Sequence, residues 1–210
     1  SSMMQALRLL IVWLHASTIL ASPLKGSVIA DCNLLWPQAM VPYHFAPELP
    51  EDTRMAVLEA MRLWEQYTVI EFIPANLNTT TDYVEFITAT GKTCASSVGR
   101  QGGMQLLRLA PRCQTMEIAH ELGHLLGLWH EQARLDRDEY LEVLWENIRE
   151  DHFHNFDMRV DDGQNIGEYN YDSIMHYSAY AFSKNGKPTL KPRDEAALIG
   201  QRSYISAGDA

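Results

Sequence analysis

The stretch HELGHLLGLWHEQ at residues 120–132 constrains this chain more than any other part of its sequence. His120 and His124 are four residues apart, so in a helix both imidazoles project from one face about one turn apart. Two such rings can reach one Zn²⁺ at about 2.0–2.1 Å. Gly127 can take a positive φ that ends the helix, which lets His130 turn back as a third nitrogen ligand. The spacing predicts a metal site.

A carboxylate stands beside these predicted ligands. Three histidines leave the fourth position of a tetrahedral zinc open, whereas a structural zinc is usually closed by four protein ligands. Glu121 follows His120 and can take a proton from a water whose pKa the metal lowers to near 7. The short motif alone also fits two satisfied core histidines, but the five fixed positions of the long motif disfavour that alternative. The pattern therefore indicates hydrolytic chemistry.

A second motif, DSIMHY at residues 172–177, contains Met175 and Tyr177. A methionine is most often a core residue. The metzincin peptidases, however, combine the long zinc motif with a methionine turn beneath the metal. The two motifs in this order favour a metzincin site.

The first half of the chain has clear periodicity. We expect helices over 49–68 and 115–126, and strands over 69–74, 82–88 and within 99–111. The buried face of the first helix is expected to hold Met55, Leu58, Met61 and Trp64, with Val57 and Ala60 beside them. The second half is more polar and less periodic. A hydrophobic fraction of 46% in 210 residues is typical of a globular domain, so the chain predicts an α+β fold with looser structure after residue 127.

The N-terminal region has the pattern of a secretory signal. Arg8 precedes an apolar run from Leu9 to Leu14, and small residues stand before Pro23. An ordinary buried helix is the alternative. We expect a signal peptide and short pro-segment over 1–26 and a secreted domain over 27–210, without stable membrane association once the signal is removed. The net charge of −10 argues against nucleic acid or an anionic membrane as a partner.

Three cysteines are consistent with one disulfide and one remaining thiol in a secreted chain. Cys94 and Cys113 are the expected pair because both lie in the glycine-rich middle segment. Cys32 then remains as a free thiol, an intermolecular link, a metal-blocking ligand or a buried thiol.

The chain resembles the astacins, a branch of the metzincin zinc endopeptidases. The resemblance rests on LWPQAMVPY, DYVEFIT, GRQGG, HELGHLLGLWHEQARLDRDEY, DSIMHY and IGQRSYISAGD, which lie between residues 35 and 209. It implies a two-lobed metzincin fold with a mixed sheet and two long helices in the first lobe. The lobes would cover about 27–127 and 128–210.

The resemblance also implies residue roles. One zinc ion would be bound by His120, His124 and His130. Glu121 would act as general base. Tyr177 would be an extra ligand that swings away and stabilises the oxyanion.

Further implied roles concern the surroundings of the site. Met175 would form its apolar base. Glu131 would meet the N-terminus of the mature chain near Ser27. The edge strand after Gly102 and Gly103 would bind an extended protein or peptide substrate by backbone pairing.

The sequence also departs from the astacin pattern. Val69 stands where the family usually has a disulfide cysteine, and the chain stops at Ala210, before the usual closing helix, so we expect the C-terminal end to be truncated. By the resemblance, Arg193 would lie near the loop that often shapes the pocket for the residue after the scissile bond, where it would favour acidic substrates; a solvated surface arginine is the alternative. The other functions considered are a catalytically silent zinc-binding scaffold and a zinc hydrolase of small amides. Glu121, His130 and Tyr177 are all present, which favours the endopeptidase.

Overall fold

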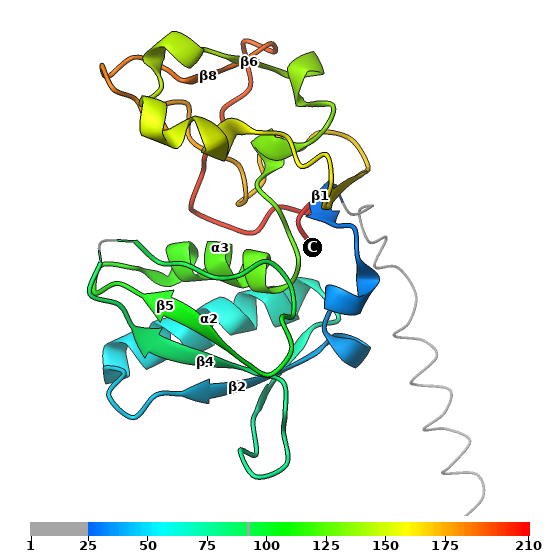
Figure 1. Ribbon diagram of the computed structural model, residues 1–210, viewed down its shortest axis with the longest axis vertical. Helices are drawn as coiled ribbons and strands as arrows, with labels where there is room; N and C mark the ends of the chain where they lie inside the picture. The colour runs from blue at the N-terminus through cyan, green and yellow to red at the C-terminus, as the bar shows by residue number, and fades with distance from the viewer. Residues whose placement is uncertain (1–24, 92) are drawn as a thin grey trace, which may run out of the picture.

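The computed structural model describes residues 25–91 and 93–210, so nearly all of the expected signal and pro-segment lies outside the described residues. The described chain forms two lobes, with the strands β2, β4 and β5 in one and β6 and β8 in the other (Figure 1). Helix α3 lies on the side of the first lobe that faces the second, and the C-terminus lies beside β1. Among the residues described, no helix combines the length and apolar character that a membrane crossing requires.

The N-terminal lobe is built on a four-stranded sheet in the order β3-β2-β4-β5. Its strands are β2 Met40–Phe45, β3 Glu71–Pro74, β4 Tyr83–Thr88 and β5 Met104–Leu109. All three neighbouring pairs are parallel. The antiparallel component of the expected mixed sheet is an isolated bridge in which Ala95 pairs with Arg108 on the outer side of β5.

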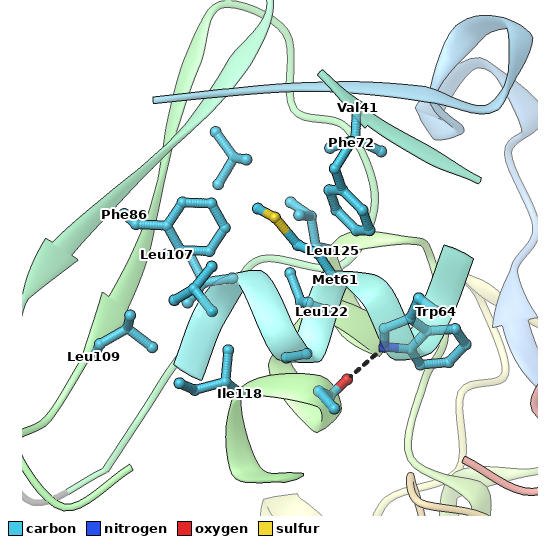
Figure 2. Packing of buried hydrophobic residues seen from close by; sticks show 14 of the residues in the cluster. Val41, Met61, Trp64, Phe72, Phe86, Leu107, Leu109, Ile118, Leu122 and Leu125 are labelled. Carbon is cyan, nitrogen blue, oxygen red and sulfur yellow. Dashed lines mark hydrogen bonds between the residues drawn. The ribbon is translucent and has the colours of Figure 1, made fainter. Parts of the chain in front are cut away.

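Two helices cover this sheet, as the periodicity predicted: α2 Glu51–Tyr67 and α3 Thr115–Leu125. Apolar side chains of both helices and of the sheet pack into one cluster, and the indole N–H of Trp64 donates to the Ala119 carbonyl at 2.9 Å (Figure 2). The expected buried face of α2 was partly wrong. Met55 and Leu58 are 58% and 40% exposed, because the helix turns Val57, Ala60, Met61 and Trp64 inward instead.

The C-terminal lobe has little regular structure. Its strands β6 Leu141–Val143 and β8 Leu190–Pro192 form one antiparallel pair, and its strand β7 Gly163–Ile166 pairs antiparallel with β1 Gly26–Ile29 from the start of the described chain. Short 3₁₀ helices connect them: Glu131–Ala133, Arg137–Glu139, Trp145–Asn147 and Glu150–Phe156. Two further 3₁₀ turns, Cys32–Leu34 and Pro37–Ala39, follow β1 on the way to β2.

One disulfide and one backbone hydrogen bond connect further parts of the fold. Cys94 and Cys113 form the expected disulfide, with their Cα atoms 6.3 Å apart. Cys32 is exposed and free, so the buried-thiol alternative for it was wrong. Lys25 donates its backbone N–H to Gly208 at 2.8 Å, which holds the start of β1 against the C-terminal segment.

Candidate metal centre

Helix α3 carries the first two histidines into the interior. It begins with a capping box in which Gln114 and Glu117 satisfy each other's backbone N–H groups. Its inner face is apolar, so the helix is buried along most of its length. His120 and His124 are only 7% and 6% exposed and project from the same side.

The histidine rings have defined tautomers. His120 Nδ1 lies 2.8 Å from the Ile174 carbonyl oxygen, and His124 Nδ1 lies 2.8 Å from that of Leu128. A carbonyl can only accept, so both Nδ1 atoms carry the proton and both Nε2 atoms present lone pairs. Burial lowers the pKa of all three ring systems, that of His124 to about 4, so the rings are neutral at physiological pH.

The three Nε2 atoms converge on one point. His130 Nε2 lies 3.2 Å from that of His120 and 3.1 Å from that of His124. Converging lone pairs repel one another without a cation between them. Tetrahedral Zn–N bonds of 2.0–2.1 Å place the nitrogens about 3.3–3.4 Å apart, so the three histidines fit a zinc ion.

Two glycines of the motif make this convergence possible. Gly127 has φ +107°, which ends α3 and turns the chain toward His130, as predicted. Gly123 was not singled out in the sequence. A β-carbon at Gly123 would lie 2.5 Å from Met175 Sδ, so the glycine admits Met175 against the helix that carries both ligands.

Glu121 lies beside His120 on the wall of a cavity. Burial raises the pKa of its carboxyl to about 7, although a hydrogen bond from the Ser96 backbone and the charge of Arg202 act in the opposite direction. The structure thus places a carboxyl group with a near-neutral pKa next to the predicted metal position.

Tyr177 lies on the other side of the histidines. Its ring centroid is 4.4 Å from that of His130. Burial raises the pKa of the phenol to about 12, so the hydroxyl keeps its proton at neutral pH. The backbone N–H of Tyr177 donates to Gln132 Oε1 at 3.2 Å, which ties the tyrosine to the chain just after the third histidine.

Two cavities flank the histidine cluster. The one beside Glu121 has a volume of about 290 Å³ and is lined by Thr93, Cys94, Arg112, Cys113, Glu117, His120, Glu121 and Arg202. The one beside Tyr177 has about 180 Å³ and is lined by Ser96, Val98, His124, Trp129, His130, Ala133, Asn155, Asp157, Arg159 and Tyr177. Segment 93–98 contributes residues to both cavities, so it forms a continuous border of the site.

This border differs from the expected one. Gly102 and Gly103 line neither of the two cavities; they form an exposed turn, in which the Gly103 N–H donates to Asp82. Ala95 exchanges both backbone hydrogen bonds with Arg108 of β5, at 3.0 and 2.9 Å. Segment 93–98 therefore pairs with the outer side of β5 at Arg108, and it lines both cavities where the strand after the glycines was expected to do so.

The arginine beside the site is Arg202, and Arg193 lies away from it, as its surface alternative predicted. Arg193 donates to the Asp138 carbonyl and lines neither cavity. Arg202 lines the cavity beside Glu121 and donates to the His176 carbonyl at 3.0 Å. It comes from an irregular segment, so no periodic pattern in the sequence indicated it.

Glu131 is buried behind the histidines. Its Oε1 accepts from the Asn170 N–H at 2.7 Å and lies 3.5 Å from Arg134 Nη1. Burial raises the pKa of this carboxyl to about 7. The backbone of Gly26 is adjacent, since a β-carbon built on Gly26 would be 3.6 Å from Glu131 Oε2. The start of β1 and Glu131 are thus brought together.

Known proteins share this arrangement. A family profile described as Astacin, a peptidase family, matches residues 28–210. Zinc metalloproteinase nas-13 of Caenorhabditis elegans is 37% identical over 199 residues, covering 90% of this chain and 43% of that protein. Tolloid-like protein 2 of Homo sapiens is 36% identical over 208 residues, covering 93% of this chain and 20% of that protein. This chain therefore spans less than half the length of these relatives.

Solved structures agree with the sequence comparisons. High choriolytic enzyme 1, a hatching enzyme zinc-protease from Oryzias latipes (medaka fish), superposes with a TM-score of 0.74 at 33% identity, covering 85% of this chain and 88% of that one. Myroilysin, at 22% identity and a TM-score of 0.57, shares the fold. From the profile match, the relatives and the zinc-binding geometry together, the chain belongs to the astacin family of zinc metallopeptidases.

Proposed function

We propose that this chain is a zinc-dependent endopeptidase that hydrolyses internal peptide bonds of extended protein substrates. One observation carries the proposal. Three histidine Nε2 atoms converge beside a carboxyl group whose pKa is raised by burial to about 7. A site that only stabilises the fold has no need of such a base.

The side chains divide the chemistry among them. Zinc, when bound by His120, His124 and His130, supplies a Lewis acid for the scissile carbonyl and for the attacking water. Glu121 takes a proton from that water and passes it to the leaving amine, a role suited to its near-neutral pKa. Tyr177 keeps its phenolic proton and donates it in a hydrogen bond to the carbonyl oxygen as negative charge develops there.

Segment 93–98 is the proposed guide for the substrate backbone. Ala95 directs both of its backbone groups toward Arg108, so those of Cys94 and Ser96 face the opposite side, as alternate residues of an antiparallel pair do. The Ser96 N–H donates to Glu121, so the Cys94 backbone groups and the Ser96 carbonyl are the proposed partners of a substrate. An extended peptide can add there as a further strand. Antiparallel addition would place the residues after the scissile bond in the cavity beside Glu121.

The side chains that line that cavity indicate which substrate residues it would favour. Arg112 and Arg202 both line it. Burial lowers the pKa of the Arg202 guanidinium, whereas the charges of Glu117 and Glu121 raise it. A substrate carboxylate that enters the cavity would form ion pairs with these guanidinium groups. We therefore propose that cleavage before acidic residues is favoured.

The surroundings support a secreted protein that is activated by cleavage. The Cys94–Cys113 disulfide is typical of oxidising compartments. Ser27 is 1% exposed, and its buried Oγ has no hydrogen-bond partner among residues 25–91 and 93–210. We propose that the catalytic domain covers 27–210, with lobes that meet near 127–128. An amine released near Ser27 would then lie close to the buried Glu131 carboxylate.

A digestion experiment tests the proposal. The zinc-loaded chain is incubated with an unfolded protein, and the cleaved bonds are mapped by mass spectrometry. We expect cleavage that a chelator stops, that added zinc restores, and that Glu121→Gln abolishes while the zinc stays bound. Arg193→Gln is the control and should leave the cleavage pattern unchanged. A zinc-loaded chain that cuts nothing would identify the silent scaffold, and cleavage of small amides alone would identify the other hydrolase.

A further inference from the structure

The carboxylate of Asp209 is buried close to the metal centre without touching it. It is 4% exposed. Its oxygens accept from Ser173 Oγ at 2.5 Å, from the Ile174 N–H at 3.0 Å, and from Ser206 N–H and Oγ at 3.0 and 2.8 Å. Within residues 25–91 and 93–210, no lysine or arginine forms a salt bridge with it. Hydrogen bonds from the Met175 turn and from Ser206 therefore hold this acid in place.

The directions of these hydrogen bonds are determined by the neighbouring donors. Ser206 Oγ accepts from Asn170 Nδ2 at 2.8 Å, so its own proton points to Asp209. Ser173 Oγ accepts from the Met175 N–H at 2.9 Å, so its proton also points to Asp209. The carboxyl group accepts at all four contacts, which is the bonding of an ionised carboxylate.

These bonds continue as far as a metal ligand. The Met175 N–H and the Ile174 C=O belong to the same peptide group. The Ile174 carbonyl oxygen accepts from His120 Nδ1 at 2.8 Å. The opposite nitrogen of that ring, Nε2, is one of the three converging lone pairs. One chain of hydrogen bonds thus runs from the carboxylate through a hydroxyl, a peptide group and an imidazole to the metal position.

We propose that Asp209 is a positioning residue for the metal centre, which orients His120 and increases the basicity of its Nε2 through Ser173 and the peptide group between Ile174 and Met175. Every hydrogen bond in the chain points its donor toward the carboxylate, so each bond polarises the next in the same sense. Carboxylates that act on a ligating histidine increase its basicity and fix its ring. Here two groups are interposed, and the same peptide group also holds Met175 in place.

The proposal rests on the zinc-binding part of the proposed function and not on peptide hydrolysis. It therefore needs a readout other than activity. Zinc affinity by competition with a chromophoric chelator is one such readout. The visible absorption of the Co²⁺-substituted protein is a second, because its d–d bands report the ligand field that the histidines supply.

The experiment compares four variants of the full chain: Asp209→Asn, Ser173→Ala, the double variant and Asp172→Asn. Asp172 is the matched control, since its exposed carboxylate accepts from Tyr204 at 2.6 Å and takes no part in the chain of hydrogen bonds. We expect each single variant of Asp209 or Ser173 to weaken zinc binding by about 10- to 100-fold and to shift the Co²⁺ bands. We expect the double variant to bind zinc about as tightly as the single variant with the lower zinc affinity.

Two results would overturn the proposal. One is that Ser173→Ala, folded by circular dichroism, binds zinc as tightly as the parent chain with unchanged Co²⁺ bands. The other is that the two single effects multiply in the double variant, which would mean that the residues act independently. Ser173→Ala is the decisive variant if Asp209→Asn fails to fold, because it leaves the bonds from Asp209 to Ile174 and Ser206 in place. A zinc-loaded parent chain that cuts no peptide bond, while the variants still bind zinc more weakly, would count against the proposed function and leave this proposal standing.

Discussion

In the N-terminal lobe, twenty buried apolar side chains of the described residues form one cluster around the sheet and its two helices, whereas the C-terminal lobe has a second cluster of only five. The five are Leu141, Ile148, Phe156, Tyr169 and Leu190. Three members of the larger cluster, Ile174, Met175 and Ile205, come from the last forty residues of the chain, within 171–210. The segment beneath the histidines therefore packs with the first lobe.

The second lobe is organised by buried polar groups instead. Arg134 is 1% exposed and donates to four backbone carbonyls. These are the carbonyls of Gly26, Ile166, Gly167 and Glu168. Its guanidinium also pairs with Asp136 at 2.8 Å. One side chain thus donates hydrogen bonds to backbone carbonyls of β1, of the end of β7 and of the loop after it. In a larger lobe, further strands of a sheet would supply such donors.

The largest expected effect is the loss of stability when Arg134, the buried cation of the C-terminal lobe, is replaced. Arg134→Met would remove the side-chain donor from four backbone carbonyls, of which that of Gly26 is the most buried, and would leave Glu131 without its cationic neighbour. We expect the free energy of unfolding to fall by about 3–5 kcal/mol in urea titrations. Arg62→Met is the control, since Arg62 pairs with Glu59 on the exposed face of α2 and its loss should change the free energy of unfolding far less. Equal losses in the two variants would show that Arg134 does not organise the lobe.

The second prediction tests the apolar lobe through its corrected helix face. Met61 is 3% exposed and Leu58 is 40% exposed. Met61→Ala should lower the free energy of unfolding by about 2–5 kcal/mol, because it leaves a cavity in the core. Leu58→Ala should change it by less than about 0.5 kcal/mol. Chemical denaturation of both variants measures this difference. A larger loss in the free energy of unfolding for Leu58→Ala would mean that Leu58 lies on the buried face of α2, as the sequence predicted.

The third prediction concerns the tie between segment 93–98 and α3. Replacing Cys94 and Cys113 by serine opens a loop with a sequence separation of 19. We expect a loss of about 3 kcal/mol in the free energy of unfolding. Zinc affinity should change little, since neither cysteine is a ligand. If the free energy of zinc binding falls by as much as the free energy of unfolding, the disulfide positions the histidines as well.

The smallest expected effect is the acid dependence of the polar lobe. The Arg134 guanidinium lowers the pKa of the Asp136 carboxyl. Because the pKa is lower in the folded chain than in the unfolded chain, the ion pair stabilises the fold above the unfolded pKa. That stabilisation is lost as pH falls through the folded pKa. Asp136→Asn should therefore flatten the acid side of a stability–pH curve, and identical curves for both proteins would contradict this.

The contrast between the lobes also explains which features the sequence predicted. Helices α2 and α3 and strands β3, β4 and β5 were expected because apolar periodicity follows from packing against one core. His120 and His124 were expected because a single helix fixes their spacing. Arg202 and segment 93–98 reach the site through irregular backbone, whose conformation depends on distant hydrogen bonds. Such long-range pairings leave no local pattern in the sequence.

The same reasoning applies to the turn that contains Met175. Its motif was visible, but the hydrogen bonds that hold it come from Ser206 and Asp209, more than thirty residues later. The sequence showed that a methionine belonged there. Only the structure shows that Gly123 makes room for it and that Asp209 holds its backbone.

The most direct test of the account is the zinc K-edge X-ray absorption spectrum of the purified chain, combined with metal analysis. We predict one zinc per chain, bound by three imidazole nitrogens at about 2.0–2.1 Å, with the remaining positions held by oxygen. That coordination leaves room for a substrate beside Glu121. A sulfur ligand, such as the Cys32 thiolate, or a fourth imidazole would show a closed site and would contradict the account.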